Sequence, residues 1–170
     1  MLAQRGANVV AADLKVTTAD FAGHGQGPGS GAIAPIEADV SMLDDVARMV
    51  AFAEREFGKL GGAVNNAGVS AAGSMIEDLS LSAWQRTLDI NLTGVFLCLK
   101  HEIAAMQRSG GGAIVNVSSG AALRVAARMA DYNASKAGVV SLTRSAAIEV
   151  SGRGIRVNAV LPGAIETPML

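Results

Sequence analysis

The sequence predicts an α/β fold built on a doubly wound parallel β-sheet. Short β-branched runs, each ended by Gly, Asn or Asp, alternate along the chain with longer stretches of helical periodicity. Hydrophobic residues make up 50% of the 170 residues and charged residues only 17%, a composition typical of strands buried on both faces. Strands separated by helices pair in parallel through right-handed crossovers, which favours a sheet of this kind.

Signals at the ends of the predicted elements set their limits. Gly6 and Gly58 stand where a left-handed cap would end a helix, and Ser41 can cap the start of the helix that Gly58 ends. The glycine-rich stretch 24–31 is predicted to be a flexible surface loop. In chain order we expect the end of a helix at 1–6, strands at 7–12 and 32–38, a helix at 41–57, a strand at 62–65, a helix from 82 or 83 to 108, a strand at 113–117, a helix at 131–150 and a strand at 155–161.

Composition excludes several classes of partner. The net charge is −1 and the basic residues are scattered, so the basic surface that nucleic acid requires is not expected. The apolar runs are too short for a membrane span, and the N-terminus lacks the pattern of a signal peptide. Cys98 is the only cysteine and suits a reducing compartment. The sequence therefore predicts one soluble, cytoplasmic domain over 1–170 without nucleic-acid or membrane partners.

Polar or turn-forming residues follow each predicted strand. Because the carboxyl ends of parallel strands meet at one edge of a sheet, and ligands bind beyond that edge, we expect these residues to gather on one rim. They are Asp13, Asp39, Asn65-Asn66-Ala67-Gly68, Ser118-Ser119 and Pro162-Gly163.

Tyr132 and Lys136 carry the strongest local signal. They are four residues apart on a predicted helix, so both side chains face the same way. An ammonium next to a phenol stabilises the phenolate, which would let a tyrosine exchange protons with a substrate hydroxyl. Taken alone, the pair is more typical of an exposed amphipathic helix face. Ser119, 13 residues upstream at a strand end, supplies a second hydroxyl for the same substrate oxygen.

Two other kinds of chemistry have little support. His24 and His101 are the only histidines, and no carboxylate cluster has the spacing of metal ligands, so no metal site is predicted. A serine hydrolase is disfavoured because Ser119 does not lie in a Gly-x-Ser-x-Gly turn.

Five motifs, in this order along the chain, resemble those of the short-chain dehydrogenase/reductase family. They are Asn65-Asn66-Ala67-Gly68, Asn91, Asn116-Val117-Ser118-Ser119, Tyr132-x-x-x-Lys136 and Pro162 to Met169. The resemblance covers essentially the whole chain and implies a Rossmann-like sheet. It also implies that the family's first strand, with its glycine-rich pyrophosphate loop, and its C-terminal strand are missing from 1–170. The missing first strand would lie between the strands at 7–12 and 62–65, so strand edges should be exposed there.

The resemblance implies a role for each catalytic candidate. Tyr132 would be the general acid/base, with Lys136 activating it and holding the nicotinamide ribose. Ser119 would polarise the carbonyl or orient the alcohol, and Asn91 would support a proton-relay water. Without the resemblance, Ser119 is more typical of a strand-end cap, and Asn91 of a helix residue that bonds locally or to solvent. Ser118 is expected to be the structural serine of its pair.

The same resemblance implies a nicotinamide cofactor. Asp13 would bind the adenine ribose 2′-hydroxyl and repel a 2′-phosphate, which favours NAD over NADP, although Lys15 could soften this preference. Asp39, followed by Val40, resembles the adenine contact. The remaining cofactor candidates are Asn66, Ala67, Gly68, Tyr132, Lys136, Pro162, Gly163, Ile165 and Thr167, the last for the nicotinamide carboxamide.

The leading hypothesis is an oxidoreductase that transfers a hydride between NAD(H) and a small secondary alcohol or ketone. The alternative is an inactive, truncated fragment that only associates with family members. Family resemblance further implies a homodimer or homotetramer formed through the helices at 83–108 and 131–150.

Overall fold

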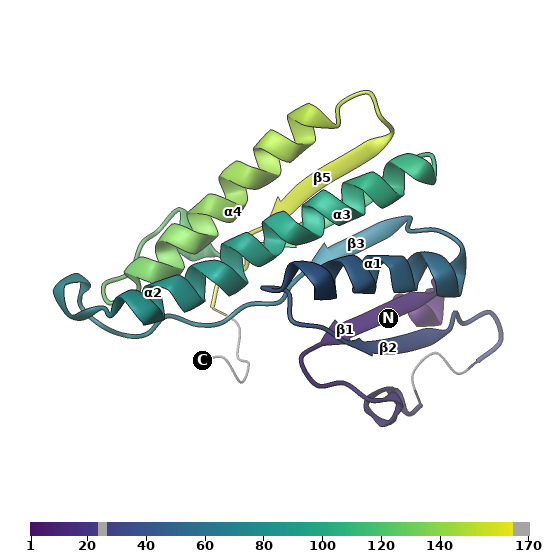
Figure 1. Cartoon of the computed structure of the whole chain (residues 1–170), viewed down its shortest axis with the longest axis horizontal. Coiled ribbons are helices and arrows are strands. Elements are labelled where there is room, and N and C mark those ends of the chain that lie inside the picture. Colours follow the sequence, from purple (N-terminus) through teal and green to yellow (C-terminus); the bar gives the residue numbers. More distant parts are fainter. Residues whose placement is uncertain (24–26, 165–170) are drawn as a thin grey trace.

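The computed structural model describes residues 1–23 and 27–164 as two parallel β-sheets with long helices packed against them (Figure 1). Helices α1 (Leu43–Phe57), α3 (Gly94–Arg108) and α4 (Ala130–Glu149) lie side by side over one face of the strands. The opposite face is more open, since Val64 is 57% exposed and Val160 is 45% exposed. The prediction that strands are buried on both faces is therefore wrong for the described residues, because their helices cover only one face.

The first sheet pairs β1 (Val9–Asp13) with β2 (Ile33–Glu37). A 3₁₀ turn at Ala3–Arg5 precedes β1, and Gly6 ends it with a φ of 87°, as the sequence predicted. The loop before β2 includes the described residues of the predicted glycine-rich loop, whose residues 24–26 lie outside the described part.

The second sheet contains β3 (Gly62–Asn65), β4 (Gly112–Val117) and β5 (Ile155–Val160), all parallel, with β4 in the middle. Its covered face forms the main hydrophobic core with α3 and α4. The fully buried core side chains include Met106, Ile114 and Val139.

The described strands β1 and β3 do not pair with each other. A cleft of about 980 Å³ lies between them, lined by residues of both strands and by α1 and α3. This division matches the expectation that a further strand belongs between the two, and that the edges of β1 and β3 are open without it.

Helix α1 (Leu43–Phe57) ends at Gly58, whose φ of 79° forms the predicted left-handed cap. Its start differs from the prediction. Ser41 does not cap the helix, because its hydroxyl donates a 2.6 Å hydrogen bond to Asp39 Oδ1. The N-cap position is occupied by Met42, which has no side-chain capping bond.

The predicted helix from 82 or 83 to 108 consists of three consecutive parts. Helix α2 (Leu81–Leu88) is capped by Ser80, whose hydroxyl accepts a bond from the Ala83 N–H. A π-helical turn, Asp89–Thr93, then leads into α3 (Gly94–Arg108). Such turns are rare and frequently occur at functional sites.

Helix α4 (Ala130–Glu149) packs against β5 and α2. Its N-terminal turn lies close to the 3₁₀ turn Gly120–Ala122, which follows β4. None of the helices among residues 1–23 and 27–164 combines the length and hydrophobicity of a membrane span.

Candidate active site

The pair Tyr132 and Lys136 lies on α4 as the spacing predicted. The Lys136 Nζ is 5.7 Å from the centre of the Tyr132 ring. Lys136 is 4% exposed, and its Nζ donates a 3.0 Å hydrogen bond to the Val117 carbonyl at the end of β4. Burial disfavours the ammonium and lowers the pKa of Lys136 below its ordinary value. The alternative of an exposed helix pair is therefore wrong for Lys136.

The two serines after β4 have different partners. The Ser118 hydroxyl donates a 2.7 Å bond to the Lys136 carbonyl, so it joins the strand end to α4, as expected of a structural serine. Ser119 Oγ accepts a 3.1 Å bond from the Ala121 N–H and caps the following 3₁₀ turn. The Ser119 hydroxyl donates to no acceptor among residues 1–23 and 27–164, which leaves its proton available to a ligand.

Asn91 is fully buried in the π-helical turn. Its Oδ1 accepts a 2.8 Å bond from the Val69 N–H, and its Nδ2 donates to the Val69 carbonyl at 2.9 Å. The same Nδ2 donates to Ser135 Oγ on α4 at 3.2 Å. The side chain therefore connects the loop after β3 to α4. Its hydrogen bonds go to residues far away in the sequence, not to its own helix.

Gly68 lies directly against two of the catalytic candidates. A Cβ at Gly68 would be 3.1 Å from Asn91 Oδ1 and 3.5 Å from Lys136 Nζ. Glycine allows this close approach of the backbone without displacing the Asn91 side chain. Gly68, Asn91 and Lys136 thus form one packed group at the carboxyl end of β3.

Six cofactor candidates share the cleft between the two sheets. Asp13 and Asp39 stand on its β1–β2 side, each with one carboxylate oxygen bonded locally, Asp13 to the Leu14 N–H and Asp39 to Ser41. Val40 packs beside Gly94 at the start of α3. The six that line the cleft are Asp13, Asp39, Val40, Asn66, Ala67 and Gly68.

The candidates after β5 lie beside the end of β4. The Gly120 N–H donates a 2.8 Å bond to the Pro162 carbonyl, which places Pro162 and Gly163 next to the turn that Ser119 begins. Ile165 and Thr167 lie outside the described residues. No group of three or more His, Cys, Asp or Glu side chains in the described part of the chain is placed to hold a metal ion.

Sequence reasoning missed a buried polar network around Glu102. Asn65 Nδ2 donates to Glu102 Oε2 at 3.0 Å and to Asn116 Oδ1 at 2.9 Å, so an amide bridge joins the neighbouring strands β3 and β4. Asn116 Nδ2 donates in turn to the Thr143 hydroxyl at 2.9 Å. Burial raises the pKa of Glu102 to about 7, partly offset by the Asn65 bond. The Asn residues at adjacent strand ends were the only sequence signal.

A second missed residue is Asp131, immediately before Tyr132. It is 1% exposed and accepts hydrogen bonds from Thr87 Oγ1 and the Ala72 N–H. Its position in the first turn of a helix resembles an ordinary helix-start acid, so nothing in the sequence separated it from exposed ones.

Comparison with known proteins identifies the family. The family model described as enoyl-(acyl carrier protein) reductase matches residues 1–170. A short chain dehydrogenase from Mycobacterium smegmatis superposes with a TM-score of 0.87 at 30% identity, over 95% of this chain and 68% of that chain. The chain belongs to the short-chain dehydrogenase/reductase family.

Other relatives of this short-chain dehydrogenase/reductase act on ring alcohols, by their names. Cis-4-hydroxycyclohexanecarboxylate dehydrogenase of Sinomonas cyclohexanicum is 43% identical over 100% of this chain and 68% of the relative. Cyclohexanol dehydrogenase of Acinetobacter sp. is 38% identical, again over 100% of this chain and 68% of the relative. The chain thus spans about two-thirds of the length of these proteins, and the predicted membership of an oxidoreductase family is confirmed.

Proposed function

We propose that this chain forms the catalytic body of an NAD(H)-dependent oxidoreductase that interconverts a secondary alcohol and a ketone. The observation that carries the proposal is the convergence at one sheet edge of Lys136, Gly68 and Asn91, with Ser119 and Tyr132 on the adjoining elements. The names of the relatives favour this chemistry over an inactive, merely associating fragment.

In this proposal Tyr132 exchanges a proton with the substrate oxygen. Lys136, held by the Val117 carbonyl beneath the Tyr132 ring, stabilises the phenolate through its positive charge. Ser119 donates its hydroxyl proton to the same substrate oxygen and so orients the carbonyl or alcohol. Asn91 supports the proton relay by holding the loop and α4 together around these groups.

The proposed cofactor is NAD, which when bound supplies the acceptor or donor of the hydride. Gly68 supports this assignment, because it lines the cleft and lies next to Lys136, the residue proposed to hold the nicotinamide ribose. Asp13, at the end of β1, would bind the adenine ribose, and its charge disfavours a 2′-phosphate. Asp39, Val40, Asn66 and Ala67 line the same cleft. Pro162, Gly163, Ile165 and Thr167 complete the proposed cofactor-binding set from the segment after β5.

We further propose a homodimer or homotetramer formed through α2–α3 and α4. These helices carry large apolar side chains that are unusually exposed: Leu81 at 78%, Phe96 at 48% and Ile148 at 77%. A contact between copies through these helices would bury such side chains. Sedimentation velocity of the purified protein tests this, and a monomer at micromolar concentration would contradict it.

The experiment that tests the function is oxidation of cyclohexanol or cis-4-hydroxycyclohexanecarboxylate with NAD⁺, followed by the formation of NADH. Ser119→Ala should lower kcat by about 100-fold, because a donor to the reacting oxygen is lost. Ser151→Ala, in the exposed turn after α4, is the matched control and should behave as wild type. If Ser119→Ala is as active as Ser151→Ala and wild type, Ser119 has no part in the mechanism.

A further inference from the structure

Asp131 is a buried carboxylate to which the proposed chemistry gives no role. It lies in the first turn of α4, directly before Tyr132, and is 1% exposed. Its Oδ2 accepts hydrogen bonds from the Thr87 hydroxyl at 2.8 Å and from the Ala72 N–H at 3.2 Å. Among the described residues it forms no ion pair. Two neutral donors and the N-terminal end of the helix therefore surround the buried carboxyl group.

Two side-chain hydrogen bonds join α4 to α2 and to the π-helical turn that follows it. Thr87 and Asn91 are four residues apart, and so are their partners Asp131 and Ser135 on α4. The first connection is the bond of 2.8 Å from Thr87 to Asp131, and the second is the bond of 3.2 Å from Asn91 to Ser135. Since residues four apart stack on one helix face, the connections lie about one turn apart. Tyr132 falls between them along α4.

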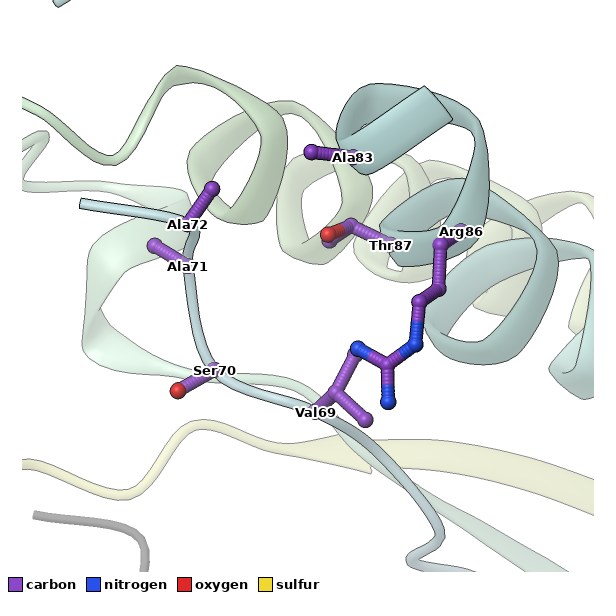
Figure 2. Close-up of a pocket in the computed structure, with 7 residues that line it drawn as sticks. All are labelled: Val69, Ser70, Ala71, Ala72, Ala83, Arg86 and Thr87. Atoms are coloured by element: carbon purple, nitrogen blue, oxygen red, sulfur yellow. The ribbon is translucent and has the colours of Figure 1, made fainter. Parts of the chain in front are cut away.

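Asn91 and Asp131 also hold the two ends of segment 69–72, in the middle of the loop after β3. Asn91 bonds both the N–H and the carbonyl of Val69, and Asp131 bonds the N–H of Ala72. Figure 2 shows this loop facing Thr87 and Arg86 of α2 across an open space. The cavity measures about 350 Å³. The hydrogen bonds of Asn91 and Asp131 lie on either side of this cavity and join the loop to the helices.

We propose that Asp131 is a positioning residue for Tyr132. Together with Thr87 it fixes the first turn of α4 and the 69–72 loop, as Asn91 does one turn further along. The inference rests on the proposed function, in which Tyr132 must meet a substrate oxygen within hydrogen-bond reach. A shift of about 1 Å in such a group lowers the rate by about 100-fold.

Thr87 offers a test that separates hydrogen bonding from packing. Valine has nearly the shape of threonine but no hydroxyl, whereas serine keeps the hydroxyl and loses the methyl group. We expect Thr87→Val to lower kcat for cyclohexanol about 10- to 100-fold while the KM for NAD⁺ stays within about twofold. Thr87→Ser should retain most of the wild-type kcat. If serine is as damaging as valine, the site is a packing site and the proposal is overturned.

A second measurement does not depend on turnover. Hydrogen–deuterium exchange should be faster at the Ala72 amide and in the first turn of α4 in Thr87→Val and in Asp131→Ala than in wild type. Asp44→Ala is the matched control, because Asp44 is an exposed acid in the first turn of α1.

The outcomes distinguish the two proposals. Unchanged exchange in both variants overturns the positioning role, whether or not the protein is active. Faster exchange with an unaltered kcat also overturns it, because the contact is then structural only. Faster exchange in a protein that oxidises no alcohol supports the connection between α2 and α4 and contradicts the proposed function instead.

Discussion

Lys136 and Glu102 are both ionisable and almost fully buried, at 4% and 3% exposure. Burial opposes the charged form of each, so it lowers the pKa of Lys136 and raises that of Glu102 to about 7. Lys136 has the Val117 carbonyl as acceptor, whereas Glu102 receives one amide bond from Asn65. The surroundings of single residues therefore determine which charges the interior holds near neutral pH.

Glu102→Gln should make the protein more stable at alkaline pH. The pKa of Glu102 is about 7 in the folded chain, against an ordinary 4.5, so the folded state keeps a proton that the unfolded state releases. Stability contributed by this group is present below about pH 4.5 and is lost as pH rises to about 7. The variant should gain up to about 3 kcal/mol at about pH 8 and little at about pH 5.

Urea unfolding of wild type and Glu102→Gln at both pH values measures this difference. Glu149→Gln is the control, because Glu149 is exposed at the end of α4 and should change stability little at either pH. An equal effect of Glu102→Gln at both pH values would contradict the burial argument.

Asp13→Asn should shift cofactor preference towards NADP. Removing the carboxylate removes its repulsion of a 2′-phosphate, and the nearby Lys15 remains to attract it. We expect the ratio of kcat/KM for NADP⁺ to that for NAD⁺ to rise by about tenfold or more. Lys15→Ala should move the ratio the other way. An unchanged ratio in Asp13→Asn would show that Asp13 does not face the adenine ribose.

At the level of the elements, the contact between α3 and the segment after β2 depends on Gly94. A Cβ at Gly94 would lie 2.9 Å from Val40 Cγ2 and 3.2 Å from the Val40 carbonyl. A Cβ at Gly138 on α4 would lie 2.8 Å from Leu92 Cδ2, the end of a flexible side chain. Both glycines therefore let their helix come close to a neighbour. The neighbour of Gly94, Val40, includes rigid backbone, whereas the neighbour of Gly138 is a flexible leucine side chain.

Gly94→Ala should lower stability more than Gly138→Ala does. Alanine gains about 1 kcal/mol of helix propensity at either site. Overpacking costs about 1–3 kcal/mol where the neighbour cannot move, which applies to the Val40 backbone, whereas Leu92 can change rotamer. Thermal unfolding should give a lower Tm for Gly94→Ala than for Gly138→Ala. The reverse order would contradict this account of the α3 contact.

Most elements could be predicted because their signals are local. Gly6 and Gly58 end their helical segments through their own conformational freedom. Ser41 was misassigned as a cap because Asp39, two residues earlier, accepts its hydroxyl. The π-helical turn was not predicted, since one wider turn barely changes the spacing of apolar residues.

The site was predictable to a similar degree. The pairing of Tyr132 with Lys136 follows from helical spacing alone. Asp131 could not be recognised because its partners Thr87 and Ala72 are 44 and 59 residues away in sequence. Contacts between residues so far apart in the sequence depend on the whole fold and cannot be predicted from a local pattern.

Considered as a whole, the molecule has a three-stranded sheet that contains buried residues and a two-stranded sheet, β1–β2, that contains none. β4 contains the fully buried Ile114 and Asn116, whereas no residue of β1 or β2 is fully buried. The open cleft between β1 and β3 separates the two sheets. The part that holds Tyr132 and Lys136 is therefore the better packed part.

Hydrogen–deuterium exchange should show this difference. Amides of β4 should exchange most slowly, and those of β1 and β2 faster, because fewer buried contacts oppose local opening. NADH should slow exchange in β1 if Asp13 binds the adenine ribose. Equal protection of the two sheets in the free protein would contradict the described packing.

The central claim, that this sheet edge carries out alcohol oxidation, is tested most directly by Tyr132→Phe. NADH formation from NAD⁺ and cyclohexanol is measured for wild type and variant, with NADH binding followed by fluorescence on the same samples. The account predicts a loss of turnover of about 100-fold or more with NADH affinity changed far less, because the variant lacks only the phenol hydroxyl that exchanges the proton. A Tyr132→Phe variant that oxidises cyclohexanol as fast as wild type would contradict it.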